Sequence, residues 1–218
     1  MKKRLLSIAT ALMLIVSVST VAYAANGFNK AVFDNAADVT VTRDDMDGTL
    51  MATTTSLIGE KGIIAPEGRD ERIQVYAGVG ITDSVNLLSI VFKDYSHDAA
   101  NINGIIIKIG NKRYSFSGLN VSQDILRGSG TYYIGESTTI EVTSKSIPMM
   151  TELIEHRNEE IRVRLQGTNR NVDFVLTDDM KNSIINLYNL YVAGGGTNAA
   201  SMQIIDKVTK IDVTVGQD

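Results

Sequence analysis

The 218-residue chain contains no cysteine and no tryptophan, and it has only two histidines and two prolines. Without cysteine it can form no disulfide bond, carry no lipid anchor on a cysteine and use no thiol nucleophile. His97 and His156 do not form an H-E-x-x-H zinc motif. The G-x-S-x-G nucleophile motif and the phosphate-binding P-loop pattern are also absent. These absences predict no catalytic residues, no metal site and no cofactor.

The first 24 residues have the three parts of a secretory signal peptide. Residues 2–4 are basic, residues 5–18 are largely apolar, and residues 22–24 form a small-residue cleavage site. The apolar run is short for a membrane span, and no later run approaches the roughly 20 residues that a span needs. We therefore expect a bacterial protein whose residues 25–218 are secreted, either into the medium or into the periplasm.

The chain that remains after cleavage is acidic. The leader removes three of the 21 basic residues and none of the 25 acidic ones, so the formal net charge goes from −4 to −7. Nucleic acid attracts a basic surface, and so does an anionic membrane, so this balance argues against both as partners. The remaining 194 residues are enough to bury the core of one domain.

Residues 160–191 give the clearest secondary-structure signal. Apolar residues alternate over 161–166 and again over 172–176, on either side of a turn rich in Gly and Asn, which is typical of a β-hairpin. Thr177 then stands at an N-cap position, and an apolar stripe with helical spacing follows it. We predict a helix over 178–192 that packs on the apolar face of its own hairpin.

A second hairpin is predicted over residues 105–116, around a two-residue Gly-Asn turn. This register pairs Ile107 with Tyr114 and Ile105 with Phe116. Both pairs then lie on one face of the sheet, as a buried face requires.

Other segments predict further elements. Residues 72–81 alternate, and the continuously apolar run 85–92 indicates a central strand covered on both faces. Residues 146–157 fit a second helix. Residues 202–209 fit either a helix or a strand, and residues 210–215 fit a closing strand at a sheet edge.

Together these signals predict a single α+β domain over residues 25–218. We expect seven to nine mostly antiparallel strands and two main helices, near residues 146–157 and 178–192. Residues 120–135 are polar and rich in Gly, and are expected to form a loop.

Two tyrosines are candidate binding residues. Tyr132 and Tyr133 follow a glycine-rich segment. Exposed tyrosines offer an apolar ring and a hydroxyl group, which suits sugars or proteins. The alternative is that one tyrosine is buried in the core and the other lies at a sheet edge.

Two arginines are the other candidates. Arg162 and Arg164 fall on the polar face of the predicted strand, and we group Arg170 in the adjacent turn with them. Their guanidinium groups can bind a carboxylate or a phosphate. The alternative is a solvated strand face on which the arginines pair with Glu160 and Asp173.

Two weaker patterns have ordinary explanations. His97 lies among polar neighbours, which is typical of a solvated connection between strands, although a hydrolase can use such a residue as an acid or base. The acidic run 44–47 ends at Gly48 like a calcium loop. With Gly48 at position 6 of that loop, Arg43 and Thr54 occupy positions 1 and 12, where acids are needed, so we predict a tight turn.

The sequence therefore favours an exported, non-enzymatic domain that binds a protein, a glycan or another cell-surface component. Two alternatives remain open. One is a secreted hydrolase that uses carboxylates or His97. The other is an envelope or assembly subunit, because edge strands are expected near Val39 and Val213.

Overall fold

A computed structural model of the protein describes residues 28–44, 46, 48–54, 63–64, 72–127 and 132–217. The expected signal peptide and most of the segment between residues 54 and 72 lie outside these ranges. Within the described ranges, none of the helices has the length and apolar character needed to cross a membrane.

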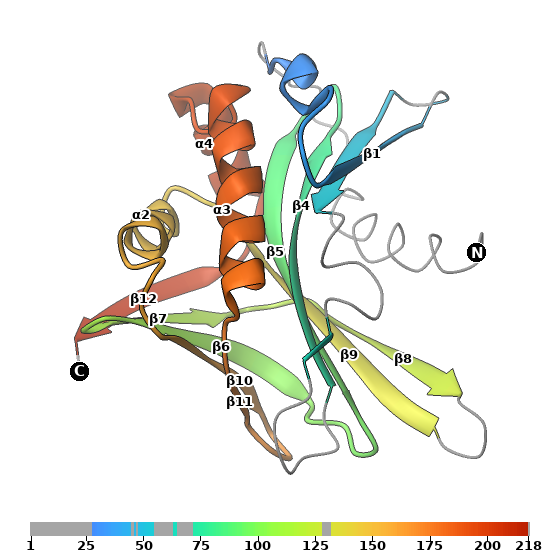
Figure 1. Cartoon of the computed structure of the whole chain (residues 1–218), viewed down its shortest axis with the longest axis vertical. Coiled ribbons are helices and arrows are strands. Elements are labelled where there is room, and N and C mark those ends of the chain that lie inside the picture. The colour runs from blue at the N-terminus through green and yellow to red at the C-terminus, as the bar shows by residue number, and fades with distance from the viewer. Residues whose placement is uncertain are drawn as a thin grey trace.

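Two antiparallel sheets make up most of the described chain (Figure 1). The strands of sheet A are β1 (Val39–Arg43), β2 (Leu50–Thr54), β3 (Ile63–Ile64), β4 (Arg72–Ile81), β5 (Asn86–Ser96), β8 (Val121–Arg127) and β9 (Tyr132–Glu141). The strands of sheet B are β6 (Ile102–Ile109), β7 (Lys112–Ser117), β10 (Ile161–Gly167), β11 (Val172–Val175) and β12 (Asp212–Gln217). Sheet A runs β1-β2-β4-β5-β9-β8, with β3 paired to β4, and sheet B runs β11-β10-β6-β7-β12.

Three of the four helices in the described ranges begin with a side-chain cap. The four are the 3-10 helix η1 (Lys30–Phe33) and the α-helices α2 (Ile147–Glu155), α3 (Asp178–Ala193) and α4 (Ala199–Val208). The Thr177 hydroxyl accepts a hydrogen bond from the Met180 N–H, and the Asn198 side chain accepts one from the Ser201 N–H. Such caps satisfy backbone donors that the first helical turn leaves open.

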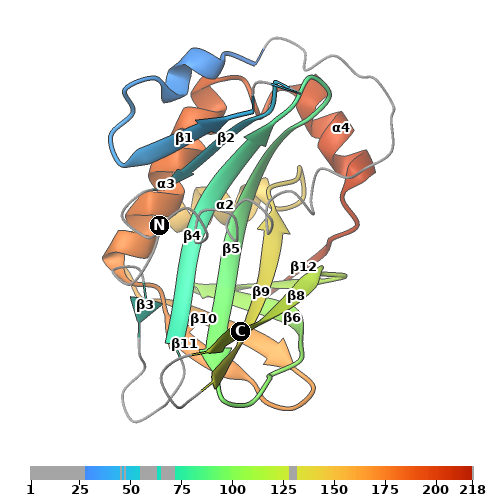
Figure 2. The same ribbon diagram turned by 90° about the vertical axis from the view of Figure 1, so that its right-hand side faces the viewer.

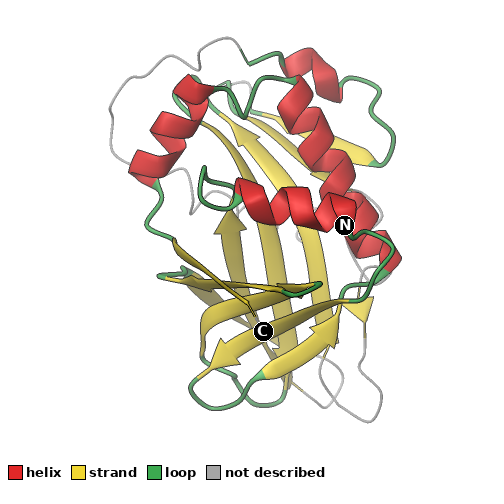
Figure 3. Ribbon diagram, turned by 90° about the vertical axis from the view of Figure 1, so that its left-hand side faces the viewer, coloured by secondary structure: helices red, strands yellow, loops and turns green. Residues whose placement is uncertain are grey.

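Sheet A has two faces, which the strand register defines. Face I contains the pair Val75 and Phe92, and face II contains the pair Tyr76 and Val91. Helices α3 and α4 pack on β4 and β5. Figures 1 and 3 show these helices along one half of face I and sheet B against the other half. The core therefore lies between face I, the helices and the inner face of sheet B.

Helix α3 packs mainly on sheet A, so the predicted packing on its own hairpin is wrong. Its neighbours are β4, β2, β5, η1 and α2. At the far end of the helix, the Tyr191 hydroxyl donates to the Asn86 carbonyl of β5 at 2.9 Å. An apolar stripe shows that a helix face is buried but does not show which surface covers it.

Other predictions have mixed outcomes. The 105–116 hairpin is confirmed in its register, as β6 and β7, and the two main helices are confirmed as α2 and α3. The predicted edge strands are also confirmed, since β1 and β12 end their sheets. The strand count of seven to nine is too low, because the described ranges hold eleven strands of four or more residues besides β3.

The extra elements come from segments with weak signals. Within the predicted loop 120–135, residues 121–127 form β8 and residues 132–135 start β9, because hydrogen bonding to a neighbouring strand can hold a polar strand at a sheet edge. Residues 202–208 belong to a third α-helix, α4, and Thr209 is its C-cap. The overall α+β class with mostly antiparallel sheets is as predicted.

Candidate functional site

The outer face of sheet B is polar because its strands alternate. Along β10, Ile161, Val163 and Leu165 are buried, whereas Arg162 and Arg164 are exposed. The two arginines therefore point away from the core, as the sequence pattern predicts.

Three cations lie side by side across the strands of this face. The register pairs Arg162 of β10 with Lys108 of β6, and it pairs Lys108 with Arg113 of β7. We call these three residues the cationic row. Directly opposed side chains in antiparallel strands lie about 5 Å apart, and like charges at that spacing destabilise the sheet.

Two acids and a fourth cation border the cationic row. Arg164 donates two hydrogen bonds to Asp173, at 2.6 and 2.9 Å, and these bonds raise the pKa of Arg164. Arg162 pairs with Glu160. Within the described residues, the Arg113 side chain has no hydrogen bond or ion pair. Around the cationic row there are thus four cations against two anions, on a chain of net charge −4.

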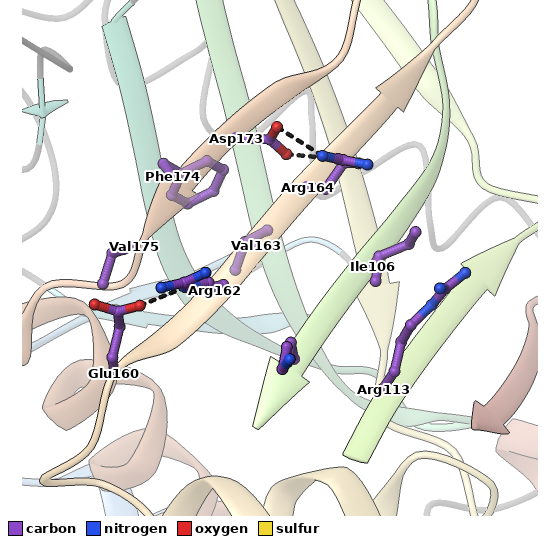
Figure 4. A pocket seen from close by; sticks show the side chains of 10 residues that line it. Ile106, Arg113, Glu160, Arg162, Val163, Arg164, Asp173, Phe174 and Val175 are labelled. Carbon is purple, nitrogen blue, oxygen red and sulfur yellow. Dashed lines mark hydrogen bonds and ion pairs between the residues drawn. The ribbon is translucent and has the colours of Figure 1, made fainter. Parts of the chain in front are cut away.

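These residues line a shallow groove of about 600 Å³. Figure 4 shows Arg164 against Asp173, Arg162 against Glu160, and Arg113 on a nearby strand. The aliphatic side chains in the lining are Ile106, Val163 and Val175. The groove therefore combines positive charge with some apolar surface.

Arg170 does not belong to this face, so its grouping with the other two arginines is wrong. Its guanidinium pairs with Asp94, donates to the Ser96 hydroxyl at 2.5 Å and donates to the Asp98 carbonyl at 3.1 Å. Arg170 lies in the turn between β10 and β11, where strand alternation does not apply. It joins sheet B to face I of sheet A.

A buried carboxylate beside Asp94 also has structural partners. Glu136 of β9 is the cross-strand neighbour of Asp94. It accepts hydrogen bonds from the backbone N–H groups of Ala100, Asn101 and Ile102 at 2.5, 3.1 and 3.3 Å. These bonds hold the connection where the chain passes from sheet A to sheet B. This arrangement favours a structural role for the two acids over the acid/base pair of a hydrolase.

Tyr132 and Tyr133 begin strand β9, so their predicted position at the end of a loop is wrong. Tyr132 is 59% exposed and lies near Ile125 of β8, which is 67% exposed. Tyr133 stacks on His97, with 4.5 Å between ring centroids. The Nδ1 atom of His97 donates to the Tyr132 carbonyl at 2.9 Å. The fold thus brings His97 against two adjacent tyrosines that follow it by 35 and 36 positions in the sequence.

One group of possible metal ligands lies at the end of α2. Ligand atoms of Glu152, Glu155 and His156 lie within 4.8 Å of one another. Glu152 pairs with Lys112 of β7, and His156 Nδ1 lies 2.9 Å from a carboxylate oxygen of Glu159. These ion pairs explain the cluster as the attachment of α2 to sheet B, so we assign no metal to it.

The turn after β1 is described only in part. Asp45 and Asp47 lie outside the described residues. The Asp44 carboxylate accepts from the Met46 N–H at 2.9 Å, and Gly48 has a φ of 73°. Both features are typical of a tight turn.

The cationic row includes two residues that sequence analysis missed. Lys108 and Arg113 lie on the predicted 105–116 hairpin, whose register already makes them direct neighbours. Their side chains point outward, because the buried residues next to them on these strands face the opposite side of the sheet. Only the pairing of β10 with β6 brings Arg162 into the same row, and sequence alternation does not specify which strands of two hairpins become neighbours.

Comparison of the chain with protein-family models, with curated proteins and with solved structures found no match.

Proposed function

We propose that the protein is an exported, non-enzymatic binding domain that holds an anionic cell-surface polymer on the outer face of sheet B. The cationic row is the observation that supports this proposal. It sets like charges at neighbouring cross-strand positions, where each cation destabilises the next. An anion bound across the row offsets this repulsion, so binding and sheet stability favour each other.

The geometry favours a polymer with repeated anionic groups. Adjacent strands lie about 4.8 Å apart, so the three cations span roughly 10 Å at right angles to the strands. A chain of carboxylates or phosphates can follow this line and meet several cations at once. Arg162 and Arg113 offer planar forks of donors, and Lys108 offers a compact charge. A shallow groove suits a passing chain better than a small molecule, which is usually bound in a deeper pocket.

The acidic remainder of the protein limits the choice of partner. The net charge of −4 opposes long nucleic acids, whose phosphates extend beyond the groove into regions of negative charge. A glycan or polymer with sparser charges avoids this repulsion.

The test is titration of the purified protein with two glycans that carry carboxylates at wider spacing, polygalacturonate and hyaluronate, and with uncharged dextran. We expect the two polyanions to bind and dextran not to bind. In the double variant Lys108→Gln/Arg113→Gln, the loss of two charge-assisted contacts weakens polyanion binding roughly tenfold or more. The salt dependence of binding also becomes shallower in this variant, because fewer counterions are released.

A matched control separates the groove from overall charge. Lys145 and Arg157 are exposed cations outside the groove lining. The double variant Lys145→Gln/Arg157→Gln makes the same change in net charge and is expected to keep the original affinity. Equal weakening in both double variants would show that the groove is not the binding site.

The β8–β9 hairpin supports a second candidate function, capture of a protein partner. Tyr132 and Ile125 expose large apolar surfaces close together, and such surfaces mark contact sites. In pulldown from the producing cell's envelope, Tyr132→Ser is expected to lose the partner, whereas Val215→Ser, at a 57% exposed position on β12, is expected to keep it. Unchanged capture by Tyr132→Ser would remove this candidate.

A further inference from the structure

Face II of sheet A carries several buried polar side chains, two of them ionisable. Figure 2 looks onto this face, with β4 and β5 in front of α3. Its buried polar residues are Thr53, Gln74, Ser89, Lys93, Thr139 and Glu141. Face I buries as many polar residues over the same central strands, but its Asp94, Ser96, Glu136 and Thr138 have hydrogen-bond partners there. The polar set on face II therefore needs an explanation other than core packing.

Lys93 is the residue that most needs a partner. It is 8% exposed, and its ammonium group has no hydrogen bond or ion pair with any part of the chain that the structure describes. Its nearest described interaction is with the ring of Tyr76, whose centroid lies 5.5 Å from Nζ. Burial lowers the pKa of Lys93, and the negative charge of Asp124 partly offsets this effect. A buried ammonium with three donors and no acceptor is costly.

Tyr76 adds a second donor without an acceptor. Its side chain is 1% exposed, and its hydroxyl has no hydrogen-bond partner. Buried tyrosine hydroxyls are normally hydrogen-bonded. Two neighbouring side chains on one face thus present unused donors, and one of them is cationic.

Glu141 lies at the other end of the polar set. The register pairs Lys93 with Ser137 and Ser89 with Glu141, so the two charged residues are separated by four positions along β9, or about 13 Å. They do not pair with each other. Thr139, whose hydroxyl donates weakly to Glu141 at 3.4 Å, lies between the two ends, and Ser89 lies beside Glu141. A Cβ built on Gly80, near the Glu141 end of the face, would meet no atom within 4 Å, so this part of the face has room.

From these contacts we propose that face II binds a hydroxylated carboxylic acid, of the sugar-acid class, with its carboxylate between the Lys93 ammonium and the Tyr76 hydroxyl. The carboxylate supplies the acceptor that both donors lack. The hydroxyl groups of the ligand meet Ser89, Thr139 and the carboxyl group of Glu141, which act as donors or acceptors. The ring of Tyr76 gives the carbon skeleton an apolar surface. This site is separate from the groove on sheet B.

Thermal melting of the purified protein tests the proposal with three probes: glucuronate, glucose and hexanoate. Glucuronate carries both the carboxylate and the hydroxyl groups, and each of the other probes lacks one of them. At about ten times its dissociation constant, glucuronate is expected to raise Tm by roughly 3–6 °C. Glucose and hexanoate are expected to give clearly smaller shifts at the same concentration.

Variants locate the effect. Lys93→Met keeps the length of the side chain and removes its charge, and we expect it to abolish the glucuronate shift whatever its own Tm. Lys145→Met, at an exposed lysine, is the matched control and is expected to keep the shift. If Lys93→Met does not fold, Tyr76→Phe removes one hydroxyl only and is expected to reduce the shift.

The outcomes against the proposal are distinct. No shift with glucuronate, or an equal shift in Lys93→Met or Tyr76→Phe, would overturn the site. An equal shift with hexanoate would overturn the sugar-acid class. Failure of the polyanion titration leaves this site intact, because the two experiments use different residues.

Discussion

Sheets A and B bury their surfaces in different ways. Sheet B is one-sided, because β10 alternates buried aliphatic residues with exposed arginines. In the centre of sheet A, both faces are buried, since nine of the ten residues of β4 and ten of the eleven of β5 are buried. The contrast separates two kinds of candidate site. On sheet B the polar residues are solvated and form a surface groove. On sheet A the polar residues are enclosed, where an unpaired charge is far more costly.

The largest expected effect is a loss of unfolding free energy, which we compare between a buried residue of sheet A and an exposed residue of sheet B. Phe92 is 1% exposed on face I, so Phe92→Ala is expected to lower the free energy of unfolding by about 3–5 kcal/mol. Val175 of sheet B is 43% exposed, and Val175→Ala should cost less than about 1 kcal/mol. Denaturant unfolding measures both, and similar losses would contradict the contrast between the sheets.

The next effect concerns the contact that joins the two sheets. Arg170→Ala leaves the buried carboxylate of Asp94 without its guanidinium and is expected to cost about 3 kcal/mol. Arg164→Ala breaks an ion pair whose side chains are 46% and 49% exposed, which is worth at most about 1 kcal/mol. The same unfolding measurement compares these two arginines. A larger loss of unfolding free energy from Arg164→Ala would contradict the prediction that the Arg170–Asp94 contact between the sheets stabilises the fold more than the ion pair in the groove.

A third prediction concerns the pH dependence of face II. Burial raises the pKa of Glu141, while hydrogen bonds from its own backbone and from Thr139 lower it in part. The stability that depends on protonated Glu141 is therefore present below the ordinary carboxyl pKa and is lost as pH rises through the raised value. Glu141→Gln removes this loss, so the variant should gain stability relative to the original protein as pH rises from 4 to 8. Melting curves at several pH values measure the difference, and parallel curves would contradict the prediction.

The smallest effect concerns the attachment of α2 to sheet B. The hydrogen bond to Glu159 is the main cause of the raised pKa of His156, and nearby acids add to it. The stabilisation by charged His156 is thus present below pH 6.5 and is lost as pH rises through the higher folded value. His156→Gln should flatten the stability profile slightly above pH 6.5. An unchanged profile would mean that the ion pairs with Glu152 and Glu159 contribute nothing measurable.

Local patterns in the sequence predicted much of the fold. Alternation and turn residues located the β6–β7 and β10–β11 hairpins, and the register of the first was correct to the residue pair. Spacing and capping located α3. The failures have a common cause. The three apolar residues among the seven of β8 do not alternate, and α4 follows a pattern that fits two structures, so neither segment has a strong periodicity.

The candidate sites were predicted only in part. Arg162 and Arg164 were found because alternation fixes the direction of a side chain on a strand. Lys93 was missed because it follows a continuously apolar run, where alternation gives no sign that the opposite face is polar. Whether its ammonium group finds a partner depends on the residues of β4 and β9 that lie beside it, and these are distant in sequence.

The amino-acid sequence by itself determined which residues form hairpins and helices and which face of each strand is apolar, because these depend on neighbours a few positions away. The tertiary structure decided which surfaces meet. It placed α3 on sheet A rather than on its own hairpin, it added Arg162 to Lys108 and Arg113 by pairing β10 with β6, and it separated Arg170 from that group. These outcomes depend on packing between distant segments, for which local periodicity contains no information.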